Sequence, residues 1–207
     1  MNLQLEAMAL AMPAVDSHPN RLPFRGVLTM VGVASQHPPT GSRGHRVMLT
    51  RQATETALPS LLGMAVDYAP ALDAHDVRRK IGIITQADIA AAADSNGAGE
   101  LLIGGYLFAH DFPEICVEIR NTGRQSLGMS YEIAQAYVPN PSSSIWTVTG
   151  FTFTGAAVLR RDKAAYPQTW IAIAGDPASN DSSSAAAWPS APVAAVASYA
   201  PAQGIPA

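Results

Sequence analysis

Ser130 stands in a stretch whose pattern places a hydroxyl group on an accessible strand face. The sequence LGMSYEIA at 127–134 alternates apolar residues with small or polar ones, which predicts a strand. The apolar face would enter a core, and Ser130 would share the opposite face with Gly128 and Glu132. Because glycine leaves room for a substrate backbone to approach, Ser130 is a candidate nucleophile.

His75 is the second group that could do chemistry. It lies in ALDAHDVRRK, directly ahead of a strand predicted at Ile81–Ala87, and Asp73 and Asp76 flank it. A histidine at the mouth of a strand can be oriented and polarised by neighbouring carboxylates, as a general base must be. A solvent-facing loop histidine beside the charged run 78–80 is the plainer interpretation of the same residues.

Together, a serine, a histidine and a carboxylate are the parts for acyl transfer. The hydroxyl attacks a carbonyl carbon, and the imidazole takes the proton and later gives it to the leaving amine. Backbone amides of Gly123–Gly128 are expected to hold the oxyanion. The chain has no G-x-S-x-G elbow and no phosphate loop, and the glycines of GELLIGGYL lie inside a predicted strand. We therefore expect no cofactor.

Two further sets of reactive side chains are expected to be structural. His37 and His45 lie in the loop SQHPPTGSRGH, where no cysteine or carboxylate joins them, so they are interpreted as surface residues and no metal site is expected. The single cysteine, Cys116, lies in the middle of a predicted helix. We interpret it as a small buried residue in a reducing cytoplasm.

The helix ahead of the serine strand is predicted from its cap signals and apolar spacing. Asp111 would cap its N-terminus and Glu114 would complete a capping box, while Gly123 would end it. Three apolar residues recur at helical spacing on one face: Phe112, Ile115 and Ile119.

The remaining pattern is that of a mainly β protein of the α+β class. Further strands are expected at 24–33, 46–50, 101–108 and 169–174, with two strand-like alternations over 145–159 that pivot near Gly150 and Gly155. A helix at Ala53–Leu62 would break around Pro59, and a helical turn is expected at Arg160–Tyr166. Residues 1–22 are predicted to be a flexible leader, 23–175 the folded domain, and 176–207 a disordered Ala/Pro/Ser-rich tail.

Composition excludes some classes of partner. A formal charge of −3 over 207 residues gives no basic footprint for nucleic acid. No apolar run approaches the roughly 20 residues of a membrane span, and the first residues lack the basic region of a signal peptide.

Several of these segments in this order resemble the prohead (capsid maturation) serine proteases of tailed phages and prophages. They are LPSLLGMAVDY, AHDVRRKIGIIT, a strand ending in GYL, LGMSYEI and FTGAAVLRRDKAAY. The resemblance covers about Arg25–Ile173. It implies an assemblin-like fold, a small β-barrel flanked by a few helices, and a protease domain at 23–175. His75 falls at the catalytic histidine of the family, and Ser130 at or near its serine.

The resemblance also implies substrates and a place of action. The expected activity is cleavage of scaffold, of capsid-protein extensions and of the protease itself during procapsid maturation. The major capsid protein and scaffold would be its partners, in a homo-oligomer inside the assembling procapsid in the bacterial host cytoplasm. The alternatives are a catalytically inactive structural or scaffolding relative that binds the capsid protein, and a binding module unrelated to phages.

Two assignments depend on register and position. The family pattern L-S-x-G-[YF], aligned on Leu127 and Tyr131, would put Gly128 at the serine position, whereas aligning on Met129-Ser130 keeps the hydroxyl. The two positions are about 6–7 Å apart along one strand face, so only one can be catalytic, and Ser130 is favoured. For the third member, Asp111 is favoured over three alternatives by its position alone: Asp76, His110 and Glu132.

Overall fold

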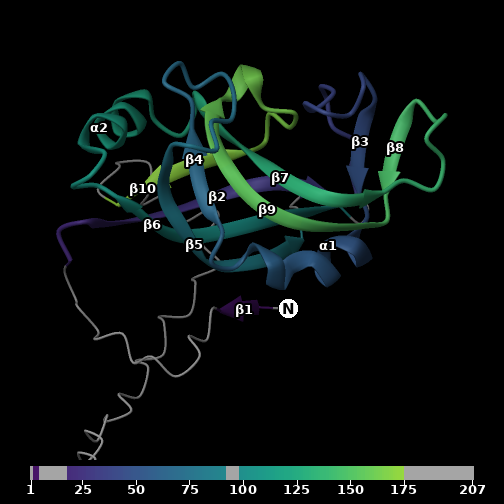
Figure 1. Cartoon of the computed structure of the whole chain (residues 1–207), viewed down its shortest axis with the longest axis horizontal. Helices are drawn as coiled ribbons and strands as arrows, with labels where there is room; N and C mark the ends of the chain where they lie inside the picture. The colour runs from purple at the N-terminus through teal and green to yellow at the C-terminus, as the bar shows by residue number, and fades with distance from the viewer. Residues whose placement is uncertain (1, 5–17, 92–97, 175–207) are drawn as a thin grey trace, which may run out of the picture.

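The structure is a computed structural model that describes residues 2–4, 18–91 and 98–174. It is mainly β, and Figure 1 shows most of the strands curling into one half-barrel. The strands of the large sheet follow the order β10-β2-β6-β5-β4-β9-β7, with β1 paired to β5. Their bounds are β1 Asn2–Gln4, β2 Arg21–Val31, β4 Ala65–Tyr68, β5 Lys80–Ala91, β6 Gly99–Phe108, β7 Leu127–Tyr137, β9 Gly150–Arg160 and β10 Trp170–Ile173.

The sheet curls far enough for its two ends to approach each other. Strand β7, at one end of the order, lies against β2 and β10 at the other end. The Met129 N–H of β7 donates to Thr169 Oγ1, one residue before β10, at 3.1 Å. Met129 and Leu127 point from β7 into the enclosed core. The expected apolar face of the serine strand is therefore confirmed.

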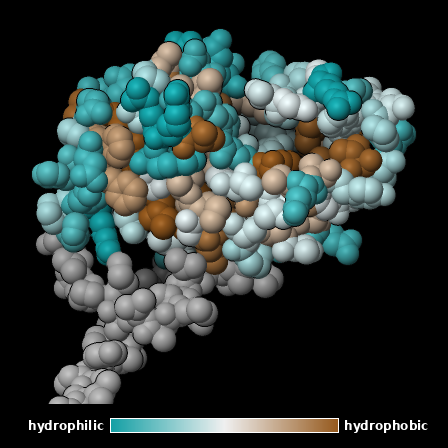
Figure 2. Space-filling view, in the orientation of Figure 1, coloured by the Kyte–Doolittle hydropathy of each residue, from teal (hydrophilic) through white to brown (hydrophobic). Residues whose placement is uncertain are grey.

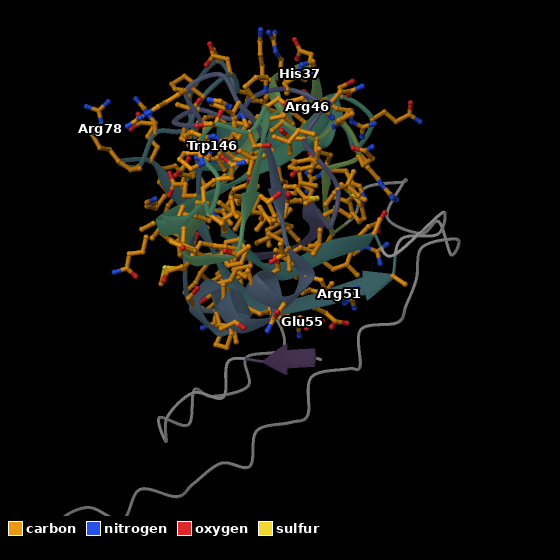
Figure 3. The ribbon with its side chains drawn as sticks, turned by 90° about the vertical axis from the view of Figure 1, so that its right-hand side faces the viewer. His37, Arg46, Arg51, Glu55, Arg78 and Trp146 are labelled. Atoms are coloured by element: carbon orange, nitrogen blue, oxygen red, sulfur yellow. The ribbon has the colours of Figure 1, made fainter. Side chains whose placement is uncertain are left out.

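In the part of the chain that the structure describes, a small second sheet and two α-helices complete the fold. β3 (Arg46–Leu49) and β8 (Ile145–Val148) pair in parallel. α1 (Arg51–Ala57) continues into a 3₁₀ turn at Leu58–Leu61, which accommodates the proline predicted to break this helix. Figure 3 shows Arg51 and Glu55 of α1 at the end of the molecule opposite His37 and Arg46. None of the helices in the described part of the chain has both the length and the apolar character needed to cross a membrane.

The helix before the serine strand forms, but its predicted cap is wrong. α2 spans Pro113–Thr122, its N-cap residue is Phe112, and no side chain caps it. Proline favours the first helical position, so Pro113 sets the start of α2 and Asp111 lies one residue too early to be its N-cap. Gly123 ends α2 with φ 71°, a conformation that glycine adopts without steric cost. Cys116 is buried, as expected, and burial raises the pKa of its thiol.

Strand β4 is absent from the sequence prediction and is central to the site. Residues 65–68 lie between β5, to which β4 is antiparallel, and β9, to which it is parallel. Four residues that closely follow the predicted helix at Ala53–Leu62 are too few to show strand periodicity, so no strand is predicted there. Strand structure also begins inside the predicted leader, since β1 pairs with β5 and β2 starts at Arg21. The predicted tail at 176–207 lies outside the described residues.

Candidate active site

Ser130 lies on β7 with its side chain on the face opposite the core. The pairing of β7 with β9 is regular here, with Ser130 opposite Ala157 and Glu132 opposite Gly155, so both side chains point to the same side. Ser130 is half-buried. Within the described residues, its hydroxyl makes no hydrogen bond.

Gly128 cannot take over the role of the serine without rearrangement. A Cβ atom at this position would lie 2.8 Å from Thr169 Oγ1 and 3.2 Å from the Ala164 Cβ. Such contacts are tighter than van der Waals packing permits, so the strand face is closed at Gly128 and open at Ser130. The sequence allows the nucleophile at position 128 or at position 130, and the structure has space for a hydroxyl side chain at Ser130.

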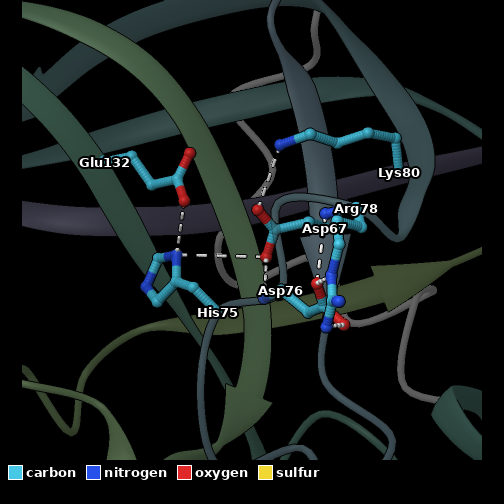
Figure 4. A network of polar contacts seen from close by, with 6 residues as sticks. All are labelled: Asp67, His75, Asp76, Arg78, Lys80 and Glu132. Carbon is cyan, nitrogen blue, oxygen red and sulfur yellow. Dashed lines mark hydrogen bonds and ion pairs between the residues drawn. The ribbon is translucent and has the colours of Figure 1, made fainter.

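His75 lies in the loop between β4 and β5, and its ring contacts two carboxylates. The Nδ1 atom is 3.1 Å from Glu132 Oε1 and 3.9 Å from Asp67 Oδ1. Figure 4 shows the other ring nitrogen, Nε2, pointing away from both acids. With the proton on Nδ1 donated to Glu132, Nε2 carries the lone pair that a general base requires.

Glu132 reaches His75 because the strand beside it has no side chain in the way. A Cβ atom on Gly155, opposite in β9, would lie only 2.5 Å from Glu132 Oε2. Glu132 and Ser130 are two residues apart on one strand face, a separation of about 6–7 Å. The acid that contacts the imidazole is therefore carried by the same short strand segment as the candidate nucleophile.

Asp67 lies behind this pair and is fully buried on β4. Its Oδ2 accepts an ion-paired hydrogen bond from Lys80 Nζ at 3.2 Å, and its Oδ1 accepts from the Asp76 backbone N–H at 3.3 Å. The pairing of β4 with β5 shifts register between Val66 and Asp67, so the acid lies at a bulge. A buried carboxylate needs such partners, and they fix the loop that carries His75.

Asp76, which flanks His75 in sequence, acts on the loop and not on the ring. Its carboxylate pairs with Arg78 Nε at 3.0 Å and Arg79 Nε at 3.3 Å. The hydrogen bonds from Arg78 lower the pKa of Asp76 below its usual range. Figure 2 shows hydrophilic side chains gathered over β4 and the loop that follows it. Arg78 and Arg79 are thus solvated loop residues, whereas Lys80 pairs with the buried Asp67 and His75 contacts two carboxylates.

Asp111, the favoured third member, does not join the cluster. Its Oδ2 accepts from Asn20 Nδ2 at 2.8 Å, and its Oδ1 is 3.7 Å from the exposed His110. His110 and Asp111 lie at the turn between β6 and α2. The structure brings together His75 and Glu132, one of the alternatives weighed, and adds Asp67, which sequence reasoning missed. The signal for Asp67 is its place inside the otherwise apolar segment AVDY, because a carboxylate in a buried strand needs a function or a partner.

The loop histidines lie outside this cluster. His45 stacks on Trp146 with ring centroids 4.6 Å apart, and its Nδ1 lies 2.9 Å from the Ser143 carbonyl oxygen. His37 is exposed and borders a shallow cleft near the start of β7 whose other lining residues are Ser126, Arg160, Arg161, Asp162 and Pro167. His37 is therefore a surface residue, as expected, whereas His45 is half-buried against Trp146.

Comparisons of the chain with protein-family models, with curated proteins and with solved structures find no match. The geometry of the site is therefore the basis for its chemistry. An imidazole held by an acid through Nδ1 keeps its Nε2 available as a general base.

Proposed function

We propose that the chain is a serine endopeptidase in which Ser130 is the nucleophile, His75 the general base and Glu132 the acid that orients the base. The contact of 3.1 Å between His75 Nδ1 and Glu132, two residues from Ser130 on the same strand face, carries this proposal. No hydrogen bond joins His75 to Ser130 among the described residues. In enzymes without bound substrate, such catalytic hydrogen bonds are often long and tighten only in the complex.

The proposed chemistry follows the order expected of an acyl transfer. Ser130 Oγ attacks the scissile carbonyl carbon while His75 Nε2 takes the hydroxyl proton. Glu132 accepts the Nδ1–H hydrogen bond and stabilises the imidazolium ion that forms. The imidazolium then protonates the leaving amine, and a water molecule activated by the same nitrogen releases the acyl group from Ser130. Asp67 is a positioning residue because it holds the histidine loop through the Asp76 amide.

The position of β7 in the sheet suits an extended peptide substrate. β7 ends the strand order, with β9 on one side. The Met129 N–H points away from β9, toward Thr169, and by strand alternation the Tyr131 amide points the same way. Strands β2 and β10 lie against β7 on this side without pairing with it, so a peptide strand that passes beside Ser130 would have to enter between β7 and these strands.

The substrates are proposed from the sequence resemblance. We infer that they are the scaffold, the extensions of the major capsid protein, and the protease itself, cleaved within the procapsid in the bacterial cytoplasm. The curled, mainly β sheet is compatible with an assemblin-like barrel, which is the finer description that the resemblance implies. We also infer from the resemblance that the protease forms a homo-oligomer.

The test combines this protein with its capsid and scaffold proteins and identifies new chain termini by mass spectrometry. Cleavage should disappear in Ser130→Ala and in His75→Ala and persist in His110→Ala, a matched histidine variant outside the cluster. Full cleavage by Ser130→Ala would refute the assignment of the nucleophile.

The second candidate function is an inactive relative that binds the capsid protein. The observation in its favour is that Ser130 makes no hydrogen bond to His75 in this structure. An inert wild-type chain that still co-purifies with the capsid protein would establish this second function.

A further inference from the structure

The proposed general base and the two acids beside it are also residue types that bind metal ions. The side-chain ligand atoms of Asp67, His75 and Glu132 all lie within 4.8 Å of one another. We propose that this cluster binds a divalent transition-metal ion such as Zn²⁺, and that the bound ion inhibits the protease. The inhibition rests on the proposed function, whereas the binding of the ion does not.

The spacing of the ligand atoms fits a small ion. Zinc binds imidazole nitrogen and carboxylate oxygen at ~2.0–2.2 Å, which puts tetrahedral ligands about 3.4 Å apart. The Nδ1 atom of His75 lies 3.1 Å from Glu132 Oε1 and 3.9 Å from Asp67 Oδ1, on either side of that value. The third pair, Asp67 and Glu132, lies within 4.8 Å, so side-chain movements of at most roughly 1–1.5 Å would place all three ligands around one ion.

The charge of the cluster also favours a cation. Two carboxylates face one imidazole, and the only lysine in the network, Lys80, pairs with Asp67 through Oδ2. Oδ1 of Asp67 faces the ring, and within the described residues Glu132 has no ion-pair partner except His75. A neutral imidazole thus leaves a net charge of −1 among these four side chains, and a divalent ion would compensate it.

The burial of the ligands suits a bound ion as well. Asp67 is fully buried, and His75 and Glu132 expose 26% and 19% of their side chains. A site of this kind has few competing waters while leaving one side open for the ion to enter. One nitrogen and two oxygens suit zinc or manganese better than magnesium, which prefers oxygen ligands and retains its waters.

Metal binding and general-base catalysis require opposite states of the same ring. A metal ion on Nδ1 uses the lone pair of that nitrogen, so the neutral imidazole must carry its proton on Nε2. An Nε2–H group cannot accept the proton of Ser130. The ion also withdraws Glu132 from the hydrogen bond that stabilises the imidazolium. Bound metal should therefore hold the protease inactive until it is removed.

Binding is tested first without reference to activity. Zn²⁺ is added to the chelator-treated full-length chain, and stoichiometry and affinity are measured by titration calorimetry. We expect one Zn²⁺ per chain, a rise in melting temperature, and no comparable effect of Mg²⁺. Ser130→Ala should bind Zn²⁺ as the wild type does, because the serine is not a ligand.

Ligand variants locate the ion. Glu132→Gln and His75→Ala should each weaken Zn²⁺ binding by more than the ~10–100-fold that loss of an outer-shell partner costs. Asp73→Asn and His110→Ala, an exposed acid and an exposed histidine outside the cluster, should leave the affinity unchanged. Melting in metal-free buffer identifies any variant that is unfolded. Lys80→Met removes a competing positive charge and should bind Zn²⁺ more tightly.

Activity then tests the inhibition. Cleavage by the wild type should fall on addition of stoichiometric Zn²⁺ and return with a chelator. A chain that binds Zn²⁺ through these ligands but never cleaves would leave the metal site standing and refute the proposed function. Failure of folded wild type to bind Zn²⁺, or equal affinity in Glu132→Gln, would overturn the metal site. Activity of the Zn²⁺-loaded enzyme, or Zn²⁺-dependent cleavage by Ser130→Ala, would overturn the inhibition.

Discussion

Gly155→Ala should separate the chemistry of the site from the stability of the fold. The added Cβ atom would lie 2.5 Å from Glu132 Oε2, whereas ordinary contacts begin at 3.4 Å, so the carboxylate must move by roughly 1 Å. Because the atom that moves is the far end of a flexible side chain, the backbone can stay in place. The distance between Glu132 Oε1 and His75 Nδ1, now 3.1 Å, would then exceed hydrogen-bond range.

The expected changes in stability and in rate differ in size. The lost hydrogen bond costs about 1 kcal/mol, and replacing glycine by alanine returns about 0.4–1 kcal/mol by restricting the unfolded chain. The free energy of unfolding should therefore change by less than about 1 kcal/mol. A displacement of ~1 Å in a catalytic group can lower the rate on the order of 100-fold, so kcat/KM should fall steeply.

The assay compares denaturant unfolding with peptide cleavage for Gly155→Ala and for Gly150→Ala in the same strand. A Cβ atom on Gly150 would meet only Tyr137 Cβ, at 3.7 Å, which is ordinary contact. The Gly150 variant should therefore keep its cleavage rate. If Gly155→Ala were as active as this control, Glu132 would not orient the base and the assignment of the acid would be refuted.

Three further outcomes follow from the structure and the sequence. Asp67→Ala should lower the free energy of unfolding by about 1–3 kcal/mol in urea titrations, because it removes the partner of Lys80 and the acceptor that holds the histidine loop; a change near zero would contradict this role. Gly128→Ser should cost about 1–3 kcal/mol by overpacking and should not restore cleavage to Ser130→Ala, so restored cleavage would show that the strand register is wrong. Deleting 178–207 should leave the melting temperature unchanged, and a large fall would show that the tail packs on the fold.

The sequence predicts those parts of the fold that a local pattern determines. Alternation over 127–134 and the apolar run around Ile81 specify strands, because one face of each must be buried. Gly123 specifies a helix end, because few other residues adopt its backbone conformation. Asp111 does not cap α2 because Pro113 fixes the first helical position, which places the N-cap at Phe112.

The candidate site could be predicted only in part, because it depends on contacts between distant segments. Ser130 and His75 are identified by residue type and by their neighbours in sequence. The partner of His75 depends on strand order: β4 carries Asp67 and lies between β5 and β9, and β7 lies beyond β9. The spacing of acids along the chain contains no information about that order. Position along the chain therefore does not determine which acid contacts His75, and Asp111 lies outside the cluster.

The arrangement also explains why a short, unpatterned strand lies at the centre of the site. β4 pairs in parallel with β9 and antiparallel with β5, so a single residue on it faces groups from both neighbours. Asp67 uses this position to accept from Lys80 at the start of β5 and from the loop that holds His75. Gly155 on β9 leaves the space through which Glu132 reaches the same ring. Because strands β4, β5, β7 and β9 all contribute to the cluster, the sheet holds the two carboxylates that contact the imidazole of the His75 loop. Such support is the condition for either a base or a metal ligand to be held in place without substrate.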